Sequence, residues 1–579
     1  MTLIHAGLLA ISVLASSPPS DPLAGVWSGE LATPGGPLAL VMHISGAEDG
    51  GWTGSVDTPS QQSYGIPLSS IEFDGHALTV RCDLTQAIWT ATLTEGGDTL
   101  DGVWAQRGVE IPLSCRRGQD LSPLPAALVQ ELEGSWEGTL DVGAIQLRIV
   151  MTLDAVSPTA MAGIMVSPDQ SPAPIPIGRV EWAGDRAVRV LIGAIGTVFD
   201  ARLAPGGATL SGSFTQRGMP LDLALKKVAR VSETRRPQEP RPPFPYRAEE
   251  VSFPNTTAGI TLAGTLTMPP GNGPFPAVVL ISGSGLQDRN EEIFQHKPFW
   301  VLADHLARRG IAALRVDDRG VGGSTSTSTA ANDTTFDFVT DVEAAVAFLR
   351  SRPEVSGGGL GLIGHSEGGV IAPLVAVKDA DINFIVLLAG TGVRGDALLL
   401  RQGEAINRAS GMSEDDIAAK SAISRALFDA LMDESLQGDP LEARLHAIIE
   451  TDPEFMEETS EAQEVALQAA IDKLTLPWIR AFLRHDPAPT LQRVTCPVLA
   501  LNGELDLQVP HAQNLPGIAA ALERGGNPDA TTMMLPGLNH LFQHCETGLP
   551  AEYGRIEETF SVDVLDLIAE WISDRAATR

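Results

Sequence analysis

An internal repeat limits what the N-terminal part of this chain can fold into. Residues 91–108 read ATLTEGGDTLDGVWAQRG and residues 201–218 read ARLAPGGATLSGSFTQRG, with ten identities in eighteen positions at an offset of 110 residues. Both copies alternate apolar and polar residues in short runs separated by glycine-rich turns, which is typical of antiparallel strands. We therefore expect two all-β modules, sandwiches or barrels, at residues 23–117 and 131–228.

Two cysteines, Cys82 and Cys115, belong to the first copy. The repeat offset places Ile192 and Leu225 at the equivalent positions of the second copy, which indicates that both cysteines point inward from their strands. A disulfide between them and a pair of buried free thiols are both compatible with this pattern, and we expect the disulfide. Each copy also begins with a tryptophan in a GxWxG motif, which we expect to be part of a β core rather than a ligand platform.

The N-terminus and the charge restrict where the protein works and what it binds. An apolar run from Leu3 to Ala15 is followed by Ser-Ser-Pro-Pro, which predicts a signal peptide at residues 1–20, although a misassigned start is the alternative. The run is shorter than the roughly 20 apolar residues of a membrane span. We expect an exported protein, periplasmic or secreted. The formal net charge of -32 repels polyanions, so nucleic acid is not an expected partner.

The second half of the chain has a different pattern. Residues 229–247 are rich in proline and arginine and predict a stiff linker. From 248 to 579, apolar strand-like runs alternate with helical stretches, which predicts an α/β fold with a doubly wound, mostly parallel sheet. Between about 398 and 486 this alternation stops and the sequence becomes helical. We interpret that segment as a cap inserted into the sheet domain.

The pentapeptide Gly364-His-Ser-Glu-Gly368 matches the nucleophile elbow G-x-S-x-G. In that elbow a sharp turn between a strand and a helix exposes the serine hydroxyl above the sheet. The motif alone is weak, because a chain of this composition contains about 0.4 such pentapeptides by chance. Its context makes it specific, since it follows a β run and opens an apolar helix. We therefore predict Ser366 as the nucleophile.

An elbow serine needs a base and an acid that follow it in the chain. Among the later histidines, His540 ends a strand and turn near the C-terminus, and we prefer it to His544 one turn further on. The acid should end the preceding strand, where Glu504 and Asp506 both occur, and Asp506 is our choice. The order Ser366, Asp506, His540 predicts a catalytic triad.

Backbone donors must stabilise the charge that develops on the tetrahedral oxygen. One is expected from the residue after the nucleophile, Glu367, and one from the glycine-rich loop Ser282-Gly-Ser-Gly285 that follows a predicted strand. Ser284 is our choice within that loop, with Gly285 as the alternate. At the return from the cap, Trp478 and Phe482 are candidates for the substrate-binding pocket, although simple cap packing explains them equally well.

Five segments in this order resemble bacterial α/β-hydrolases of the esterase and serine-aminopeptidase-like group. They are ISGSGLQDRNE (281–291), RVDDRGVGGS (315–324), GHSEGG (364–369), NGELDLQVP (502–510) and LPGLNHLFQ (535–543). The resemblance implies the same triad, and hydrolysis of a carboxylic ester with a modest acyl group. It implies no activity for the β modules.

Other site classes are less well supported. The glycines from Gly359 to Gly364 fit G-x-G-x-x-G, but the segment is itself the strand before the elbow, and no P-loop motif occurs. His540, His544 and Cys545 have metal-like spacing, but the triad already requires one of these histidines. We expect no metal and no cofactor. The alternative functions are a serine aminopeptidase or acyl-peptide hydrolase, and a binding protein whose β modules contact an envelope component or a second protomer.

Overall fold

The computed structural model describes residues 23–576 apart from 34–35, 48–50, 59–62, 95, 107–108, 118–123, 143–144, 169–170, 217–218, 232–234, 328–331 and 452–460. The predicted signal peptide lies outside the described residues. The chain divides into two compact units, residues 1–232 and 233–579. Among the helices that the structure describes, none is long and apolar enough to cross a membrane.

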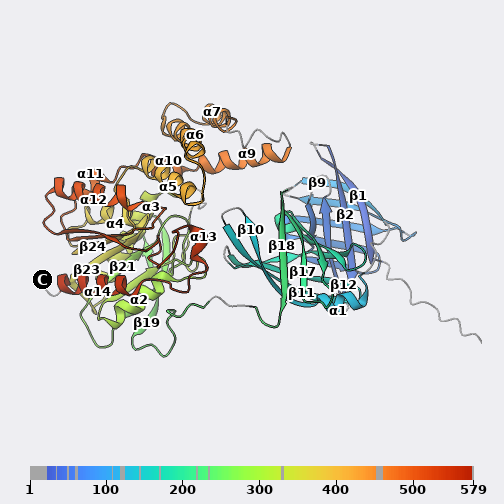
Figure 1. The fold of residues 1–579 in the computed structure, drawn as a ribbon, viewed down its shortest axis with the longest axis horizontal. Coiled ribbons are helices and arrows are strands. Elements are labelled where there is room, and N and C mark those ends of the chain that lie inside the picture. Colours follow the sequence, from blue (N-terminus) through green and yellow to red (C-terminus); the bar gives the residue numbers. More distant parts are fainter. Residues whose placement is uncertain are drawn as a thin grey trace, which may run out of the picture. The chain divides into compact units, whose positions relative to one another are not determined.

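The N-terminal unit is built from antiparallel strands (Figure 1). The first copy holds β1 (Gly25–Thr33), β2 (Gly36–Gly46), β3 (Trp52–Thr58), β4 (Ser63–Pro67), β5 (Ser70–Phe73), β6 (Ala77–Cys82), β7 (Ala87–Leu93), β8 (Thr99–Gln106) and β9 (Val109–Arg117). The second copy follows α1 (Ala126–Leu132) and holds β10 (Gly134–Val142), β11 (Ile145–Ser157), β12 (Ala160–Ser167), β13 (Ser171–Ile177), β14 (Arg179–Trp182), β15 (Ala187–Ile192), β16 (Thr197–Leu203), β17 (Thr209–Gln216) and β18 (Met219–Val228).

The two copies have the same topology. Within the described residues each forms a nine-stranded sheet, in the order β4-β3-β2-β1-β9-β8-β7-β6-β5 and β13-β12-β11-β10-β18-β17-β16-β15-β14. Strands near the two ends of each sheet contact each other, β3 with β5 and β12 with β14, so each sheet curves around its own core. Trp27 and Trp136 are fully buried in these cores, and each indole N–H donates to the carbonyl four residues earlier. The predicted pair of all-β modules is confirmed.

A buried carboxylate joins the two modules into one unit. Asp57 of the first module accepts hydrogen bonds from the Gly65 amide (2.7 Å), from His43 Nε2 (2.9 Å) and from Arg179 of the second module (3.1 Å). Burial alone would raise the pKa of Asp57, but the hydrogen bond with His43 and the charge of Arg179 hold the pKa below its usual value. This contact joins the two modules beside the packing of β4 against β13, β15 and β16.

The expected disulfide in the first module is wrong. Cys82 and Cys115 are both buried inside the same core, as the repeat predicted, but both are free thiols. They lie on β6 and β9, which β7 and β8 separate in the sheet. Three strand spacings are about 14 Å, twice the reach of a disulfide. The repeat identified inward positions correctly, but equivalence between copies does not show which strands are neighbours.

Alkylation of the protein provides a test of this correction. We expect Cys82 and Cys115 to resist iodoacetamide in the folded protein and to react after denaturation without reductant, because burial raises the pKa of the Cys115 thiol to about 12. Peptide mass spectrometry measures both states. A disulfide-linked peptide pair from the unreduced protein would contradict the assignment.

The second unit is organised around an eight-stranded sheet in the described residues. Its strands are β19 (Arg247–Asn255), β20 (Ile260–Met268), β21 (Phe275–Ile281), β22 (Ala312–Val316), β23 (Val355–His365), β24 (Phe384–Leu388), β25 (Val498–Gly503) and β26 (Ala530–Leu535). Their order is β19-β20-β22-β21-β23-β24-β25-β26, and all pairs from β22 onward are parallel. The antiparallel strands β19 and β20 form one edge. The predicted doubly wound sheet is confirmed.

Helices cover both faces of this sheet (Figure 1). The sheet helices are α2 (Pro298–Arg308), α3 (Thr335–Arg350), α4 (Gly368–Ala376), α11 (Ala488–Leu491), α12 (His511–Gly525), α13 (Pro550–Tyr553) and α14 (Val562–Ala576). One core lies between the sheet and α3, α4 and α12, and the other lies between the sheet and α2 and α14. The site therefore rests on a sheet that is packed from both sides.

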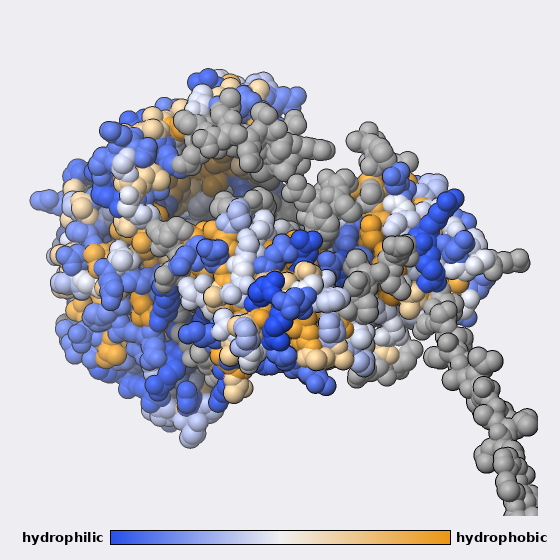
Figure 2. Space-filling model, turned by 45° about the vertical axis from the view of Figure 1, so that its right-hand side comes forward, coloured by the Kyte–Doolittle hydropathy of each residue, from blue (hydrophilic) through white to orange (hydrophobic). Residues whose placement is uncertain are grey.

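A helical cap is inserted between β24 and β25. It consists of α5 (Gly395–Ala409), α6 (Glu414–Met432), α7 (Asp439–Ile449), α9 (Glu461–Leu474) and α10 (Pro477–Arg484). Leu431, Leu445 and Leu483 belong to a small core of its own. The surface of this unit is hollowed beneath the cap helices (Figure 2).

The proline-rich segment before β19 is hydrogen-bonded to the second unit. The Arg236 guanidinium donates to the carbonyls of Phe294 (2.8 Å), Gly554 (2.9 Å) and Ile556 (2.8 Å). Gln238 donates to the Phe560 carbonyl at 2.6 Å. We call residues 235–246 the strap. The sequence predicted a linker here, and these contacts show that the strap is part of the second unit.

Candidate active site

Ser366 lies on a tight turn between β23 and α4. Its φ is +53°, a left-handed conformation that is uncommon for a residue with a side chain and is found at strained functional turns. Glycines permit this turn: a Cβ at Gly364 would lie 2.0 Å from the Gly368 carbonyl oxygen, and one at Gly368 would lie 2.2 Å from the Ile281 oxygen. The Ser366 amide donates to the Leu388 carbonyl at 2.8 Å, which ties the turn to β24.

His540 and Asp506 form a buried pair at the carboxyl ends of β25 and β26. His540 Nδ1 lies 2.9 Å from Asp506 Oδ2, and the Asp506 side chain is fully buried. Because Nδ1 faces the carboxylate, it carries a proton, and Nε2 is left as the basic nitrogen. The two weighed alternatives have other roles: exposed His544 pairs with Glu558 at 2.8 Å, and exposed Glu504 accepts from the Gly537 amide.

One cavity of about 380 Å³ brings these residues together. Ser366 and His540 line it from the sheet side, and Trp478 and Phe482 line it from the cap. The rings of Trp478 and Phe482 stack with their centroids 5.0 Å apart. Both cap residues singled out from the sequence thus face the same space as the serine. We call this space the catalytic cavity.

The loop after β21 lies against the elbow. A Cβ at Gly283 would lie 3.2 Å from the Ser366 Cβ, so this loop passes close to Ser366. The Gly283 amide is occupied, since it donates to Glu291 Oε1 at 2.7 Å. Ser284 and Glu367 both line the catalytic cavity, and their amides donate to no acceptor among the described residues. Those two amides are therefore the ones available to an oxyanion. Gly285, the alternate, lines a neighbouring cavity instead.

The Glu367 side chain is buried beside the elbow, and no cation among the described residues pairs with it. Its Oε1 accepts hydrogen bonds from the Trp478 indole at 2.7 Å and from the Thr335 hydroxyl. Burial raises the pKa of Glu367 above its usual value, and hydrogen bonds from Thr335, Trp478 and Ser284 only partly offset that effect. Glu367 thus connects the elbow, the cap and the loop after β21 at residues 282–286, which we call the oxyanion loop.

Two further residues connect the loops of the site, and sequence reasoning missed their role. Glu291 Oε1 accepts the Gly283 amide and also lies 2.8 Å from His365 Nδ1. His365 Nε2 lies 3.0 Å from the His540 carbonyl oxygen. Both nitrogens of His365 face acceptors, an arrangement that favours the doubly protonated ring. Burial alone would lower the pKa of His365, but the Glu291 carboxylate raises it. Glu291 ends the motif SGSGLQDRNE, which was the only signal in the sequence.

We expect Glu291→Gln to lower kcat about 10- to 100-fold with a smaller change in KM, because it removes charge-assisted hydrogen bonds to the oxyanion loop and to His365. The matched control is Glu292→Gln at the next, exposed position. A raised pKa of His365 means that its pairing with Glu291 stabilises the fold fully below about pH 6.5 and progressively less as pH rises through the raised pKa. The melting-temperature difference between wild type and variant should therefore shrink as pH rises. A pH-independent difference with unchanged kcat would contradict this role.

An open, mostly parallel sheet with a serine on a left-handed strand-to-helix turn, and a carboxylate and a histidine after later strands, defines an α/β-hydrolase. A comparison with protein families gives the same answer, since residues 278–547 match the alpha/beta hydrolase family. The fold and the family model thus agree that this part of the chain has an α/β-hydrolase fold.

The chain matches only part of the length of the curated relatives that follow. The chain is 25% identical to esterase EstD of Thermotoga maritima over 317 residues, which are 54% of this chain and 65% of that esterase. It is 30% identical to human acyl-coenzyme A thioesterase 1 over 145 residues, 25% of this chain and 30% of that protein. Among solved structures, Est1E of Butyrivibrio proteoclasticus with bound ferulic acid aligns with a TM-score of 0.32 and 18% identity, covering 56% of this chain and 96% of that one.

Proposed function

We propose that this protein hydrolyses carboxylic esters through an acyl-enzyme on Ser366. The observation that carries the proposal is the buried His540–Asp506 pair at 2.9 Å, with His540 and Ser366 lining one cavity. The sequence similarity to esterase EstD supports an ester as the substrate.

The geometry suggests a mechanism in two halves. His540 Nε2 takes the proton of the Ser366 hydroxyl while the oxygen attacks the ester carbonyl, and Asp506 stabilises the imidazolium that forms. The amides of Glu367 and Ser284 stabilise the oxyanion. His540 then gives the proton to the leaving alcohol oxygen, the C–O bond breaks, and an acyl-enzyme remains. In the second half water attacks the acyl-enzyme while His540 takes its proton. The bond between the acyl carbon and the Ser366 oxygen then breaks, His540 returns the proton to that oxygen, and the acid leaves.

The test combines turnover with active-site labelling. Purified protein should hydrolyse p-nitrophenyl butyrate, and a fluorophosphonate should block this activity and modify one residue, Ser366, found by peptide mass spectrometry. Turnover that persists after complete labelling would overturn the proposal. Comparing esters with matching amino-acyl anilides separates an esterase from the aminopeptidase alternative, and faster anilide cleavage would favour the latter.

Export remains a proposal that rests on the apolar run from Leu3 to Ala15. N-terminal sequencing of the protein recovered outside the cytoplasm should show a chain that begins near residue 20. An intact Met1 on cytoplasmic protein would contradict export. Contact of the β modules with an envelope component or a second protomer also remains a prediction.

A further inference from the structure

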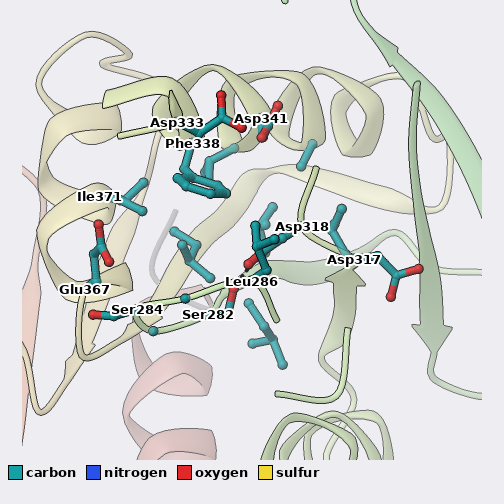
Figure 3. A pocket seen from close by; sticks show the side chains of 18 of the residues that line it. Ser282, Ser284, Leu286, Asp317, Asp318, Asp333, Phe338, Asp341, Glu367 and Ile371 are labelled. Carbon is teal, nitrogen blue, oxygen red and sulfur yellow. Dashed lines mark hydrogen bonds between the residues drawn. The ribbon is translucent and has the colours of Figure 1, made fainter. Parts of the chain in front are cut away.

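A second cavity of about 300 Å³ lies beside the catalytic cavity. Apolar side chains form much of its wall, including Leu286 from the oxyanion loop, Phe338, Val342 and Ala345 from α3, and Ile371 from α4. Phe338 extends from α3 over this space, and Ser284 and Glu367 lie together at one end of it (Figure 3). We call it the Phe338 cavity. Its volume is at the lower end of small-molecule pockets.

The two cavities share one wall. Ser284, Glu367 and Trp478 line both of them, and the first two supply the amides available to an oxyanion. A carbonyl carbon under attack must therefore lie next to the residues that border the Phe338 cavity. His540, in contrast, lines the catalytic cavity and is not part of the wall of the Phe338 cavity.

The position of His540 decides which part of an ester enters which cavity. The leaving alcohol oxygen must receive its proton from His540, so the alcohol lies on the side of the catalytic cavity. The acyl substituent extends from the same carbon in a different direction, with the Phe338 cavity beside it. We propose that the Phe338 cavity binds the acyl group of the substrate, and that this group is uncharged and apolar. The inference rests on the ester hydrolysis proposed above.

The carboxylates around the cavity favour an uncharged acyl group. Asp317 pairs with Arg289, whereas Asp318 and Glu367 have no cationic partner among the described residues. Asp318 accepts from the Ser282 hydroxyl at 2.9 Å and from the Gln287 amide at 2.8 Å, so neutral donors of the protein already engage both of its oxygens. Burial already raises the pKa of both carboxyls, to about 7 for Asp318, so a further carboxylate on the acyl group would be buried here without a cationic partner among the described residues.

The experiment compares two substrate series in variants of the cavity. The acyl series is p-nitrophenyl acetate, butyrate, hexanoate and octanoate, and the alcohol series is ethyl, butyl and hexyl acetate. Each buried methylene raises kcat/KM about fourfold. Ala345→Phe fills the cavity and should lower the hexanoate-to-acetate ratio of kcat/KM at least tenfold. Phe338→Ala enlarges the cavity and should shift the preference toward octanoate. The hexyl-to-ethyl ratio in the alcohol series should stay within twofold for both.

Ala347→Phe is the matched control, because Ala347 is exposed on the same helix. Titration with the fluorophosphonate measures the concentration of active sites, by which each rate is divided. If Ala345→Phe does not fold, Phe338→Ala alone tests whether the Phe338 cavity binds the acyl group. Monoethyl adipate, which has a carboxylate in place of the terminal methyl group of ethyl hexanoate, should be at least tenfold poorer than ethyl hexanoate as a substrate of the wild type.

The outcomes separate this inference from the proposed function. If the wild type hydrolyses esters but neither variant changes the ratios of kcat/KM in the acyl series, the inference alone is overturned. A change in the alcohol series and not in the acyl series would have the same consequence. Efficient hydrolysis of monoethyl adipate would overturn the uncharged acyl group. A wild type that hydrolyses no ester in either series would overturn both proposals.

Discussion

Ser366→Ala should lower kcat for p-nitrophenyl butyrate by about 10⁴ to 10⁶, because the variant has no nucleophile to form the acyl-enzyme. The fold should be unaffected, because the variant loses one hydroxyl of a half-buried side chain that lines a cavity. Ser435→Ala, an exposed cap residue, is the control and should behave as wild type. Rates of purified variants measured over several hours decide the result.

The same variant also tests whether the triad acts as a unit. The double variant Ser366→Ala, His540→Ala should be no slower than either single variant, since a base without a nucleophile contributes nothing. Residual activity of about 10³ over water is expected from the oxyanion amides alone. If Ser366→Ala keeps more than a hundredth of wild-type kcat, another residue is the nucleophile.

Asp506→Asn should lower kcat by about 10⁴ at neutral pH. Asp506 Oδ1 accepts from the amides of Gln508 (2.9 Å) and Val509 (2.8 Å), and Oδ2 accepts from Asn502 Nδ2 (2.8 Å) and His540 Nδ1. In the variant, the backbone N–H groups of Gln508 and Val509 would donate to the side-chain oxygen of the introduced asparagine. Its NH₂ would then face His540, which would turn to the tautomer that carries its proton on Nε2 and cannot deprotonate Ser366.

The control for Asp506 is the other carboxylate at the end of β25. Glu504→Gln should change kcat less than threefold, because Glu504 is exposed and binds the Gly537 amide rather than a histidine. Steady-state kinetics of the two variants compare the two acids directly. Equal losses in both would mean that the effect is one of loop structure and not of tautomer control.

Local patterns made some of this architecture predictable. The repeat predicted two modules of one topology because both copies keep the same alternation of apolar residues, and alternating strands and helices predicted the parallel sheet. The elbow was recognisable because its glycines, serine and flanking strand are consecutive in the chain. Histidine and acid candidates followed from their order after Ser366, since each ends a strand of the same sheet. Their catalytic roles remain predictions that the variants above test.

Contacts between distant segments were not predictable in this way. His365 ends β23, while Glu291 and the His540 carbonyl lie on two loops, and only the folded sheet brings the three together. The same holds for Cys82 and Cys115. The alternation of residues along one strand predicts that a side chain points inward, but it does not predict which strands are neighbours in the sheet. The Phe338 cavity depends on how α3 packs beside the oxyanion loop, for which the helix sequence offers no signal.

The strap fixes where the catalytic part of the chain can be cut. A fragment that begins at residue 248, where the alternating pattern starts, would lose Arg236 and leave the carbonyls of Phe294, Gly554 and Ile556 without their shared donor. Phe294 lies in the segment that contains Glu291, so the loss would extend to the loop beside the nucleophile. A shortened enzyme intended for crystallisation or directed evolution should therefore start at Arg235, ahead of the boundary that composition suggests.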